Sequence, residues 1–378
     1  MIGTDAMGHT FPGACVPFGI VQLSPDTDTI PHNINGVYQP RVYEYCAGYR
    51  YPDKTIVGFS HTHFSGTGHS DLGDLLIMPQ TGALKLNPGT ADNPDAGYRS
   101  RFSHTTEQAV PGYYTVMLDD YGVKAELTAT QRVGVHRYTY PKGTDQRFIL
   151  DLNHGLYNYD GKTLWTTLRV ENDTLITGCR LTNGWARTNY TYFAISLSKP
   201  LKNYGYKDMQ KSNYNGHWRK FKMDQNFPEI AGRKVVTYFE FDNADEQLVV
   251  KVALSATSTE GAVKNLRAEA SGRSFDQIRR QADGSWAQQL NSIQVEGTED
   301  QKAMFYTSYY HTLINPSVYQ DVDGKYRGLD QNIHQADGFT NYTIFSLWDT
   351  YRAEHPFLML MKPQAARDMV MSMIRHQQ

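Results

Sequence analysis

Between residues 98 and 256, apolar and polar positions alternate in short runs. A period of two places successive side chains on opposite faces of a strand. Turn-forming triplets such as Asp120-Tyr121-Gly122 and Pro141-Lys142-Gly143 separate the runs, and no helical spacer lies between them. The pattern predicts an antiparallel β-sandwich whose strands include residues 113–118, 123–130, 133–140, 147–153, 173–182, 192–198, 235–241 and 248–255.

After Ala256 the apolar spacing becomes that of amphipathic helices. Residues 259–270 and 274–293 each fit one helix. A capping-box pattern at Thr298-Glu299-Asp300-Gln301 predicts the start of a third helix, which ends before Pro316. The second helix carries a single apolar stripe formed by Phe275, Ile278, Ala282, Trp286 and Leu290.

The last third of the chain predicts a polar excursion followed by two helices. We expect residues 319–328 to form two short strands around Asp323-Gly324, a hairpin turn. A calcium loop fits less well there, because position twelve of such a loop is Asn332 and not Glu. Residues 346–361 and 363–378 read as an antiparallel helix pair. The predicted organisation is a β-sandwich (1–256), a helical linker (257–297) and the opening of a helical bundle or toroid (298–378).

Length, charge and amino-acid composition argue against several classes of function. The 378 residues suffice for about two domains. A net charge of -2 gives no electrostatic basis for binding nucleic acid or an anionic membrane, and no apolar run approaches the ~18 residues of a membrane span. Three cysteines without a CxxC pair predict neither a disulfide framework nor a zinc knuckle. The 26 Tyr, 16 Phe and 5 Trp suit sugar rings as well as a protein core.

The stretch GFSHTHFSGTGHSDLGDLLIMP, residues 58–79, concentrates the candidate chemistry. His61 and His63 would point to the same side of a strand, a spacing found in zinc and other transition-metal sites, with His69, Asp71 or Asp74 as third ligand. The glycines favour a second interpretation, a tightly turned loop that brings polar side chains to the rim of a pocket. A third is a buried histidine pair that only supports the loop.

Two tryptophans are candidates for sugar contacts. Trp185 stands where a strand should end, so it either caps the sandwich core or forms a stacking platform. Trp348 and Asp349 pair a flat ring with a carboxylate that can accept bonds from sugar hydroxyls. The alternative is that Trp348 belongs to the core and Asp349 favours the positive end of a helix.

Four long segments carry unusual motifs in order along the chain: IGTDAMGHTFPGACVPFGIVQLSPDT (2–27), GYRYPDKTIVGFSHTHFSGTGHSDLGDLLIMP (48–79), TLITGCRLTNGWARTNYTYFAISLSKP (174–200) and SLWDTYRAEHPFLMLMKP (346–363). Together they resemble glycoside hydrolase family 92, the exo-acting, calcium-dependent α-mannosidases. The resemblance implies a β-sandwich packed on an (α/α)6 barrel with the active site at their interface. It also implies an inverting mechanism, in which one carboxylic acid protonates the glycosidic oxygen and a carboxylate activates water, the two about 6.5 to 9.5 Å apart.

The chain departs from the family in length. Family members are roughly twice as long, and their general acid, general base and calcium ligands are expected beyond residue 378. No catalytic residue and no Ca²⁺ ligand is therefore carried over. The resemblance implies export to the periplasm, the cell surface or the medium. The residues expected to contact substrate are Trp348, Asp349, His61, His63, Asp71, Trp185 and Arg352, with His355 a weaker candidate.

These observations lead to two functional hypotheses. The first is an incomplete exo-α-mannosidase that shapes a site for terminal mannose of glycans and is inactive alone. The second is a non-catalytic carbohydrate-binding or assembly module that associates with the missing half of the barrel. For the second, the expected contact is a broad exposed apolar face built from Phe357, Leu358, Leu360, Met361, Met369, Val370 and Met373.

Overall fold

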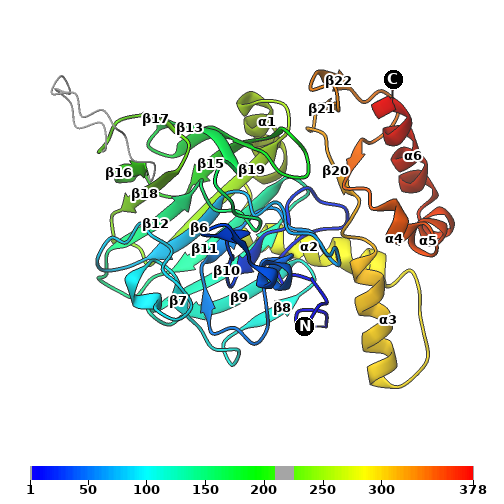
Figure 1. Cartoon of the computed structure of the whole chain (residues 1–378), viewed down its shortest axis with the longest axis horizontal. Helices are drawn as coiled ribbons and strands as arrows, with labels where there is room; N and C mark the ends of the chain where they lie inside the picture. Colours follow the sequence, from blue (N-terminus) through cyan, green and yellow to red (C-terminus); the bar gives the residue numbers. More distant parts are fainter. Residues whose placement is uncertain (1, 209–224, 378) are drawn as a thin grey trace.

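The computed structural model describes residues 2–208 and 225–377, and its dominant feature is a sandwich of two antiparallel sheets (Figure 1). In spatial order, the smaller sheet consists of β1 (Ser24–Asp26), β5 (Gly58–Ser60), β6 (Leu76–Gln80), β12 (Gln146–Asp151), β18 (Val235–Phe241) and β16 (Leu201–Asp208). The larger sheet consists of β17 (Glu229–Gly232), β13 (Thr163–Asn172), β14 (Leu175–Thr182), β15 (Asn189–Leu197), β19 (Gln247–Ser255), β11 (Val133–Thr139), β10 (Val123–Ala129), β9 (Tyr113–Leu118) and β8 (Gln108–Val110).

The predicted sandwich is confirmed, since each of the eight alternating runs forms a strand. Among the described residues, seven strands of the two sheets lie outside those runs: β1, β5, β6, β8, β13, β16 and β17. All five residues of β6 are buried, so its sequence shows no alternation, and β13 is rich in Thr and polar residues that hide its inward positions. Four two-stranded ribbons complete the β-structure: β2 (Asn33–Ile34) with β3 (Val37–Tyr38), β4 (Thr55–Ile56) with β7 (Ser100–Arg101), β20 (Ser317–Val318) with β23 (Tyr342–Thr343), and β21 (Lys325–Arg327) with β22 (Ile333–Gln335).

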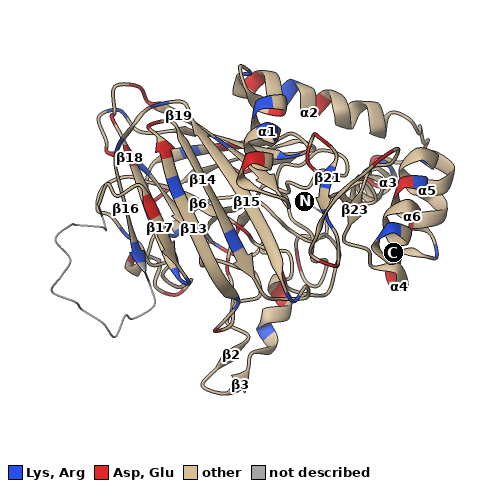
Figure 2. Cartoon of the chain, turned by 90° about the horizontal axis from the view of Figure 1, so that it is seen from above, with Lys and Arg blue, Asp and Glu red and all other residues tan. Residues whose placement is uncertain are grey.

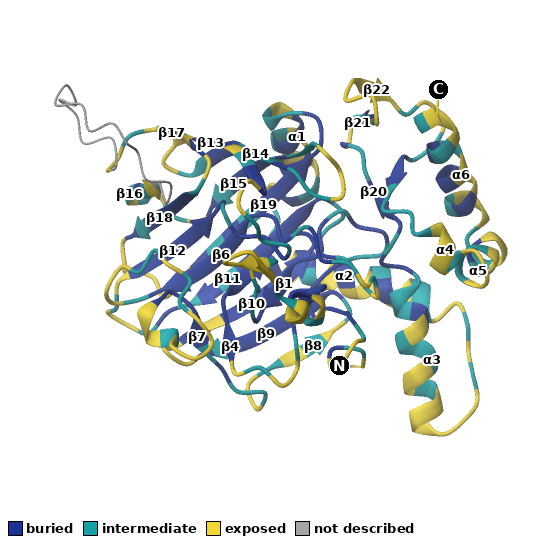
Figure 3. Cartoon of the chain, viewed as in Figure 1, coloured by how far each residue is buried: buried dark blue, intermediate teal, exposed yellow. Residues whose placement is uncertain are grey.

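The larger sheet is buried on both faces over its central strands (Figure 3). Its inner face meets the smaller sheet in the main core. On its outer face lie α1 (Thr259–Ala270) and α2 (Phe275–Leu290), which bury Leu266, Phe275 and Ile278 against Val133 and Val135. The stripe expected on α2 is therefore real: Phe275, Ile278, Ala282 and Trp286 are buried, and Leu290 packs at the edge.

The N-terminal segment ties the sandwich to the remaining helices. Phe11, Cys15 and Phe18 enter a separate core with residues of α2, α3 (Glu299–His311), α5 (Glu354–Met361) and α6 (Pro363–Gln377). Within it, Trp286 Nε1 donates to the carbonyl oxygen of Cys15 at 2.7 Å. The expected capping box of α3 is present, with Thr298 and Gln301 each accepting from the other's backbone N–H.

Two details of the last third differ from expectation. Residues 346–361 form two helices, α4 (Leu347–Thr350) and α5, and not one. Pro356 explains the break, because in a continuous helix its ring would clash with the carbonyl of Arg352. The expected hairpin at 319–328 is also wrong: the chain turns at Asp321–Gly324, but β21 pairs downstream with β22.

Burial in the helical region also differs from the predicted exposed apolar face. Leu358 and Met369, two residues of the predicted apolar face, are in the core, whereas Leu360 and Val370 are exposed. The helix predicted at 363–378 is present as α6, and residue 378 lies outside the described residues. No helix within residues 2–208 and 225–377 combines the length and apolar character needed to cross a membrane.

Candidate functional site

A cavity of about 640 Å³ lies where the sandwich meets the helical region. Its sandwich side is formed by the β5–β6 connection and the β14–β15 connection, through residues that include Thr62, Asp71, Asp74 and Trp185. Its other side comes from the segments around β20, β21 and β23 and from α6, among them Tyr319, Arg327, Phe345, Ser346 and Met373. The cavity is therefore built by residues more than 300 positions apart, with Ile20 at one end of the range and His376 at the other.

His61 is fully buried in a directional chain of hydrogen bonds. Its Nδ1 lies 2.7 Å from the carbonyl oxygen of Leu75, which can only accept, so Nδ1 carries a proton. Its Nε2 then accepts from His136 Nε2 at 3.0 Å, and His136 Nδ1 accepts from the Tyr138 hydroxyl at 2.7 Å. Burial lowers the pKa of His61 to about 4 and lowers the pKa of His136, so both rings are neutral at pH 7.

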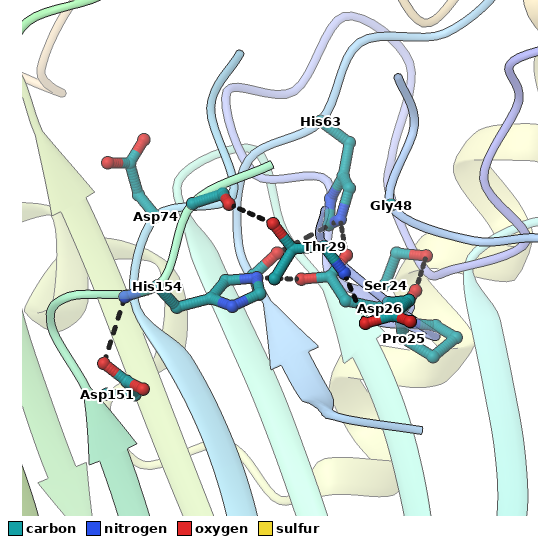
Figure 4. A network of polar contacts seen from close by, with 12 residues as sticks. Ser24, Pro25, Asp26, Thr29, Gly48, His63, Asp74, Asp151 and His154 are labelled. Atoms are coloured by element: carbon teal, nitrogen blue, oxygen red, sulfur yellow. Dashed lines mark hydrogen bonds and ion pairs between the residues drawn. The ribbon is translucent and has the colours of Figure 1, made fainter. Parts of the chain in front are cut away.

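His63 belongs to a different network, centred on the buried carboxylate of Asp26 (Figure 4). His63 Nε2 and His154 Nε2 each lie 2.8 Å from one oxygen of Asp26. Burial alone would raise the pKa of Asp26, but the two histidines outweigh it and hold that pKa well below its usual range. His63 Nδ1 also lies 2.7 Å from the carbonyl oxygen of Gln22. Both ring nitrogens of His63 therefore face oxygen acceptors, the carbonyl of Gln22 and the carboxylate of Asp26.

These contacts bear on the metal interpretation of the loop. Every ring nitrogen of His61 and His63 is already engaged in a hydrogen bond within the protein. Over residues 2–208 and 225–377, no three His, Cys, Asp or Glu side chains are grouped so that they could hold an ion. The contacts of His61 and His63 support the loop that carries them, and neither side chain lines the cavity.

Two buried ion pairs fix the acidic residues of the sandwich wall. Asp74 is paired with the fully buried guanidinium of Arg180 and accepts from Thr62 Oγ1 at 2.8 Å. Asp71 is paired with Lys162, and its Oδ2 accepts from the backbone N–H of Trp185 at 2.7 Å. Asp71 thus holds the base of the Trp185 loop, so the orientation of both carboxylates is set before any ligand arrives.

The two candidate tryptophans are exposed. Trp185 is 74% exposed at the cavity, with its ring edge-on to His69 at 4.4 Å, so it does not cap the sandwich core. Trp348 is 81% exposed on α4 and does not belong to the core either. It lies two positions beyond Ser346, which lines the cavity, and is not itself a lining residue.

The remaining candidates lie beside Trp348. Asp349 stands in the first turn of α4 and accepts from the Ser346 hydroxyl. Arg352 does not use its Nε on Asp349; it donates to the Tyr351 hydroxyl at 3.1 Å. Burial, followed by the negative charge of Asp349, raises the pKa of Glu354 to about 7. Glu354 therefore titrates near neutrality.

Sequence reasoning missed Asp26, His154, Lys162 and Arg180. Lys162 and Arg180 are distant in sequence from the carboxylates they pair with, and nothing local distinguishes them from surface cations. In the structure, Arg180 on β14 alternates with the partly exposed Cys179 and Leu181 and points inward. A cation at such a position needs a buried partner.

Comparison with known proteins identifies the chain. Residues 1–255 match the glycosyl hydrolase family 92 N-terminal domain, and residues 261–378 match the glycosyl hydrolase family 92 catalytic domain. The chain belongs to glycosyl hydrolase family 92. The four segments that carried the resemblance in the sequence each contribute residues to the cavity: Gln22, Asp71, Trp185 and Ser346 are examples.

Several family 92 proteins have related structures. One is an α-mannosidase from Bacteroides thetaiotaomicron solved with mannoimidazole, 42% identical with a TM-score of 0.90 over 99% of this chain and 47% of that chain. Another is an inverting mannosidase from Bacteroides thetaiotaomicron VPI-5482, 27% identical with a TM-score of 0.79 over 99% of this chain and 46% of that one.

A more distant relative has a known sequence. It is described as an uncharacterized secreted glycosidase of Arthroderma benhamiae, and it is 24% identical over 84% of this chain and 41% of its own length. The family 92 chain described here therefore spans about half the length of the relatives it matches.

Proposed function

We propose that this family 92 chain supplies the sandwich side and the first barrel helices of an exo-α-mannosidase active site, which removes terminal α-linked mannose from glycans. One observation carries the proposal. All four family motifs converge on a single cavity of about 640 Å³, in a chain that superposes with a TM-score of 0.90 on an α-mannosidase solved with mannoimidazole. A cavity of this size suits a monosaccharide with part of its neighbour.

In this proposal the exposed and lining residues contact the sugar. Trp185 and Trp348 offer ring faces to the C–H faces of the pyranose, and Asp71 and Asp349 accept from hydroxyls. Arg352 donates to sugar oxygens. His61 and His63 act one layer behind, by fixing the backbone on either side of Thr62.

The proposed reaction is a single displacement with inversion at the anomeric carbon. It requires a carboxylic acid at the glycosidic oxygen and a carboxylate that activates water about 6.5 to 9.5 Å away. Neither is assigned to a residue of this chain. Calcium, which would hold sugar hydroxyls and ease ring distortion, prefers a cage of oxygen ligands, and the described residues offer no such cage. We therefore assign the acid, the base and the calcium site to the half of the family 92 length that this chain does not span, and expect the chain alone to be inactive.

The activity is testable with two polypeptides. The 378-residue chain, and a version extended to the length of its solved relatives, are assayed with calcium on an aryl α-mannoside and on α-mannobiose. We expect turnover, abolished by EDTA, from the extended chain alone. Robust EDTA-sensitive turnover by the 378-residue chain would contradict its inactivity. An extended chain that hydrolyses no α-mannoside would contradict the proposed function itself.

Binding is measured separately from turnover. Mannoimidazole titrated into the 378-residue chain is expected to perturb tryptophan fluorescence, and Trp185→Phe should reduce that change. Trp165→Phe is the matched control, because Trp165 is also exposed but lies on β13 and not at the cavity.

A second function, an assembly module, is favoured by one observation. On the neighbouring helices α5 and α6, Leu360 is 78% exposed and Val370 is also exposed, and an exposed apolar surface of this kind usually meets a partner. We propose the remaining helices of the barrel as that partner. Analytical ultracentrifugation distinguishes the cases: self-association abolished by Leu360→Asp supports an unpaired face, and a clean monomer contradicts it.

We also propose that the protein is exported, to the periplasm, the cell surface or the medium, because the Arthroderma benhamiae relative is described as secreted. Fractionation of the source cells with an antibody against the chain would test this. Retention with a cytoplasmic marker would contradict it.

A further inference from the structure

A row of aromatic rings runs away from the cavity and ends on a projecting hairpin. It starts at Trp185, whose ring centre is 4.4 Å from that of His69. His69 is 5.7 Å from Tyr157, and Tyr157 is 4.9 Å from His32. His32 is in turn 5.0 Å from Tyr38 on the β2–β3 hairpin. The row thus draws on three separate segments of chain besides the Trp185 loop.

The hairpin is held beside the row by its base. The His32 backbone N–H donates to the carbonyl oxygen of Asn158 at 3.0 Å, next to Tyr157. Beyond this anchor β2 and β3 project from the body of the molecule (Figure 2). Residues 33–38 contain no charged side chain, and Ile34, Val37 and Tyr38 are all exposed, Tyr38 by 52%.

Without a ligand, the exposure of these apolar side chains to water is unfavourable. A two-stranded hairpin is marginally stable by itself, and an uncharged one that exposes most of its apolar side chains gains little from folding. The hairpin does not form a core with the sandwich, since its residues are absent from the three buried clusters. Its exposed Tyr38 ring is thus available to a ligand that reaches out from the cavity.

Sugar chains fit such a row chemically. Each pyranose has an apolar C–H face that packs on an aromatic ring and hydroxyls at its edge that stay in water. Successive ring centres are 4.4 to 5.7 Å apart, so the rings contact one another along the row, and the rings at its two ends, Trp185 and Tyr38, are exposed. Burial lowers the pKa of His69, so this ring is neutral at pH 7.

We propose that this aromatic row, from Trp185 to Tyr38, binds the sugar units that follow the terminal mannose, so that the protein recognises extended oligomannosides. The inference rests on the proposed function, since it takes the terminal sugar to occupy the cavity. It assigns to Tyr38 and the β2–β3 hairpin the discrimination between long and short glycans.

The test compares probes of different length on the 378-residue chain. Affinities for methyl α-mannoside, α-mannobiose and linear α-mannohexaose are measured by titration calorimetry for the unmodified protein, Tyr38→Ala and Tyr38→Phe. Tyr51→Ala is the matched control, because Tyr51 is also an exposed tyrosine in contact with a histidine, His104, but lies outside the row.

We expect mannohexaose to bind more tightly than the two short probes. Tyr38→Ala should weaken mannohexaose binding roughly 3- to 10-fold, the range that one lost aromatic contact gives, and leave both short probes within 2-fold. Tyr38→Phe keeps the ring and should bind as the unmodified protein does, and Tyr51→Ala should change nothing.

Other outcomes separate this inference from the proposed function. If short probes bind but mannohexaose binds no tighter, or if Tyr51→Ala weakens it as much as Tyr38→Ala, the row is not a sugar site and the cavity assignment stands. Binding of mannohexaose alone, lost in Tyr38→Ala, supports the row and contradicts the cavity assignment. If no mannoside binds, both fall. A glycopeptide whose affinity depends on Tyr38 while that of its free glycan does not would assign the hairpin to peptide and overturn the inference.

Discussion

The sandwich wall of the cavity and the α4 segment beside its helical wall hold their polar side chains in different ways. On the sandwich wall, Asp74 and Asp71 are each fixed by a buried cation from a distant strand segment. On α4, beside the helical wall, Trp348 is 81% exposed, and the Asp349 carboxylate accepts from the hydroxyl of Ser346, three residues away. The two carboxylates of the sandwich wall are thus held by side chains that are distant in sequence, whereas Asp349 on α4 is held by a nearby residue.

The difference shows which half of the site is preorganised. Side chains that must meet a ligand with accurate geometry need support from a surrounding layer. The sandwich supplies that layer through Arg180, Lys162 and the histidine networks. The helices around Trp348 have no equivalent, which fits a chain that spans about half the length of its relatives. Five predictions test this contrast.

The largest effect is expected at Arg180, whose side chain is fully buried. Arg180→Met leaves the Asp74 carboxylate buried without its cation, which should cost about 3–5 kcal/mol of unfolding free energy. Urea denaturation measures the change. In the exposed control Arg169→Met, the partner is Glu229 and the cost should stay below about 1 kcal/mol. Equal costs for the two variants would show that the sandwich wall is not specially supported.

A smaller effect concerns pH. In the unfolded chain His61 titrates near about 6.5, but in the folded protein its pKa is about 4. Between these values the unfolded state binds more protons, so stability falls as the pH drops from about 6.5 to 4, by on the order of 3 kcal/mol from His61 alone. His136→Phe removes the other histidine of this pair and should flatten the slope of stability against pH.

Glu354, the first residue of α5, should make stability depend on pH in the opposite direction. Its folded pKa is about 7, above the unfolded value of about 4.3, so the folded state binds more protons in between. Its contribution is present at low pH and is lost as the pH rises through 7. Glu354→Gln should therefore remove a fall in stability between pH 4.5 and 7, where His136→Phe removes a rise. If the two substitutions changed the slope of stability against pH in the same direction, the pKa shift assigned to Glu354 or to the histidine pair would be wrong.

The next effect is expected at Lys162, on the sandwich wall. Lys162→Met leaves Asp71 unpaired and frees the base of the Trp185 loop, so the unfolding free energy should fall by about 2 kcal/mol. Lys234→Met provides a control, because the Lys234–Asp160 pair is exposed and should contribute less than about 1 kcal/mol. Thermal denaturation of both variants gives the comparison. No difference between them would mean that the Asp71 pair does not organise the wall.

The smallest effect on stability is expected at Trp348. Because its ring is exposed, Trp348→Ala should change the unfolding free energy by no more than about 0.5 kcal/mol. Trp286, which is 2% exposed, gives the contrast: Trp286→Ala should cost about 3–5 kcal/mol. A loss above about 1 kcal/mol in Trp348→Ala would show that the helical wall is already packed in this chain.

The sequence alone determined the local structure where one physical rule dominates. Alternation between two faces gave eight strands of the sandwich, the 3.6-residue spacing gave the buried stripe of α2, and Thr298 with Gln301 gave the start of α3. These features depend on residues within a few positions of one another. The order and content of the four motifs likewise indicated family 92 without any knowledge of contacts.

Only the tertiary structure decided what the candidate residues do. His61 and His63 are two positions apart and equivalent by pattern, yet one is a neutral link to His136 and the other is paired with Asp26. Neither partner is close in sequence, and a hydrogen bond between distant residues leaves no periodicity to detect. For the same reason, the sequence could not decide whether Trp185 and Trp348 are exposed, because burial depends on what the rest of the fold packs against a side chain.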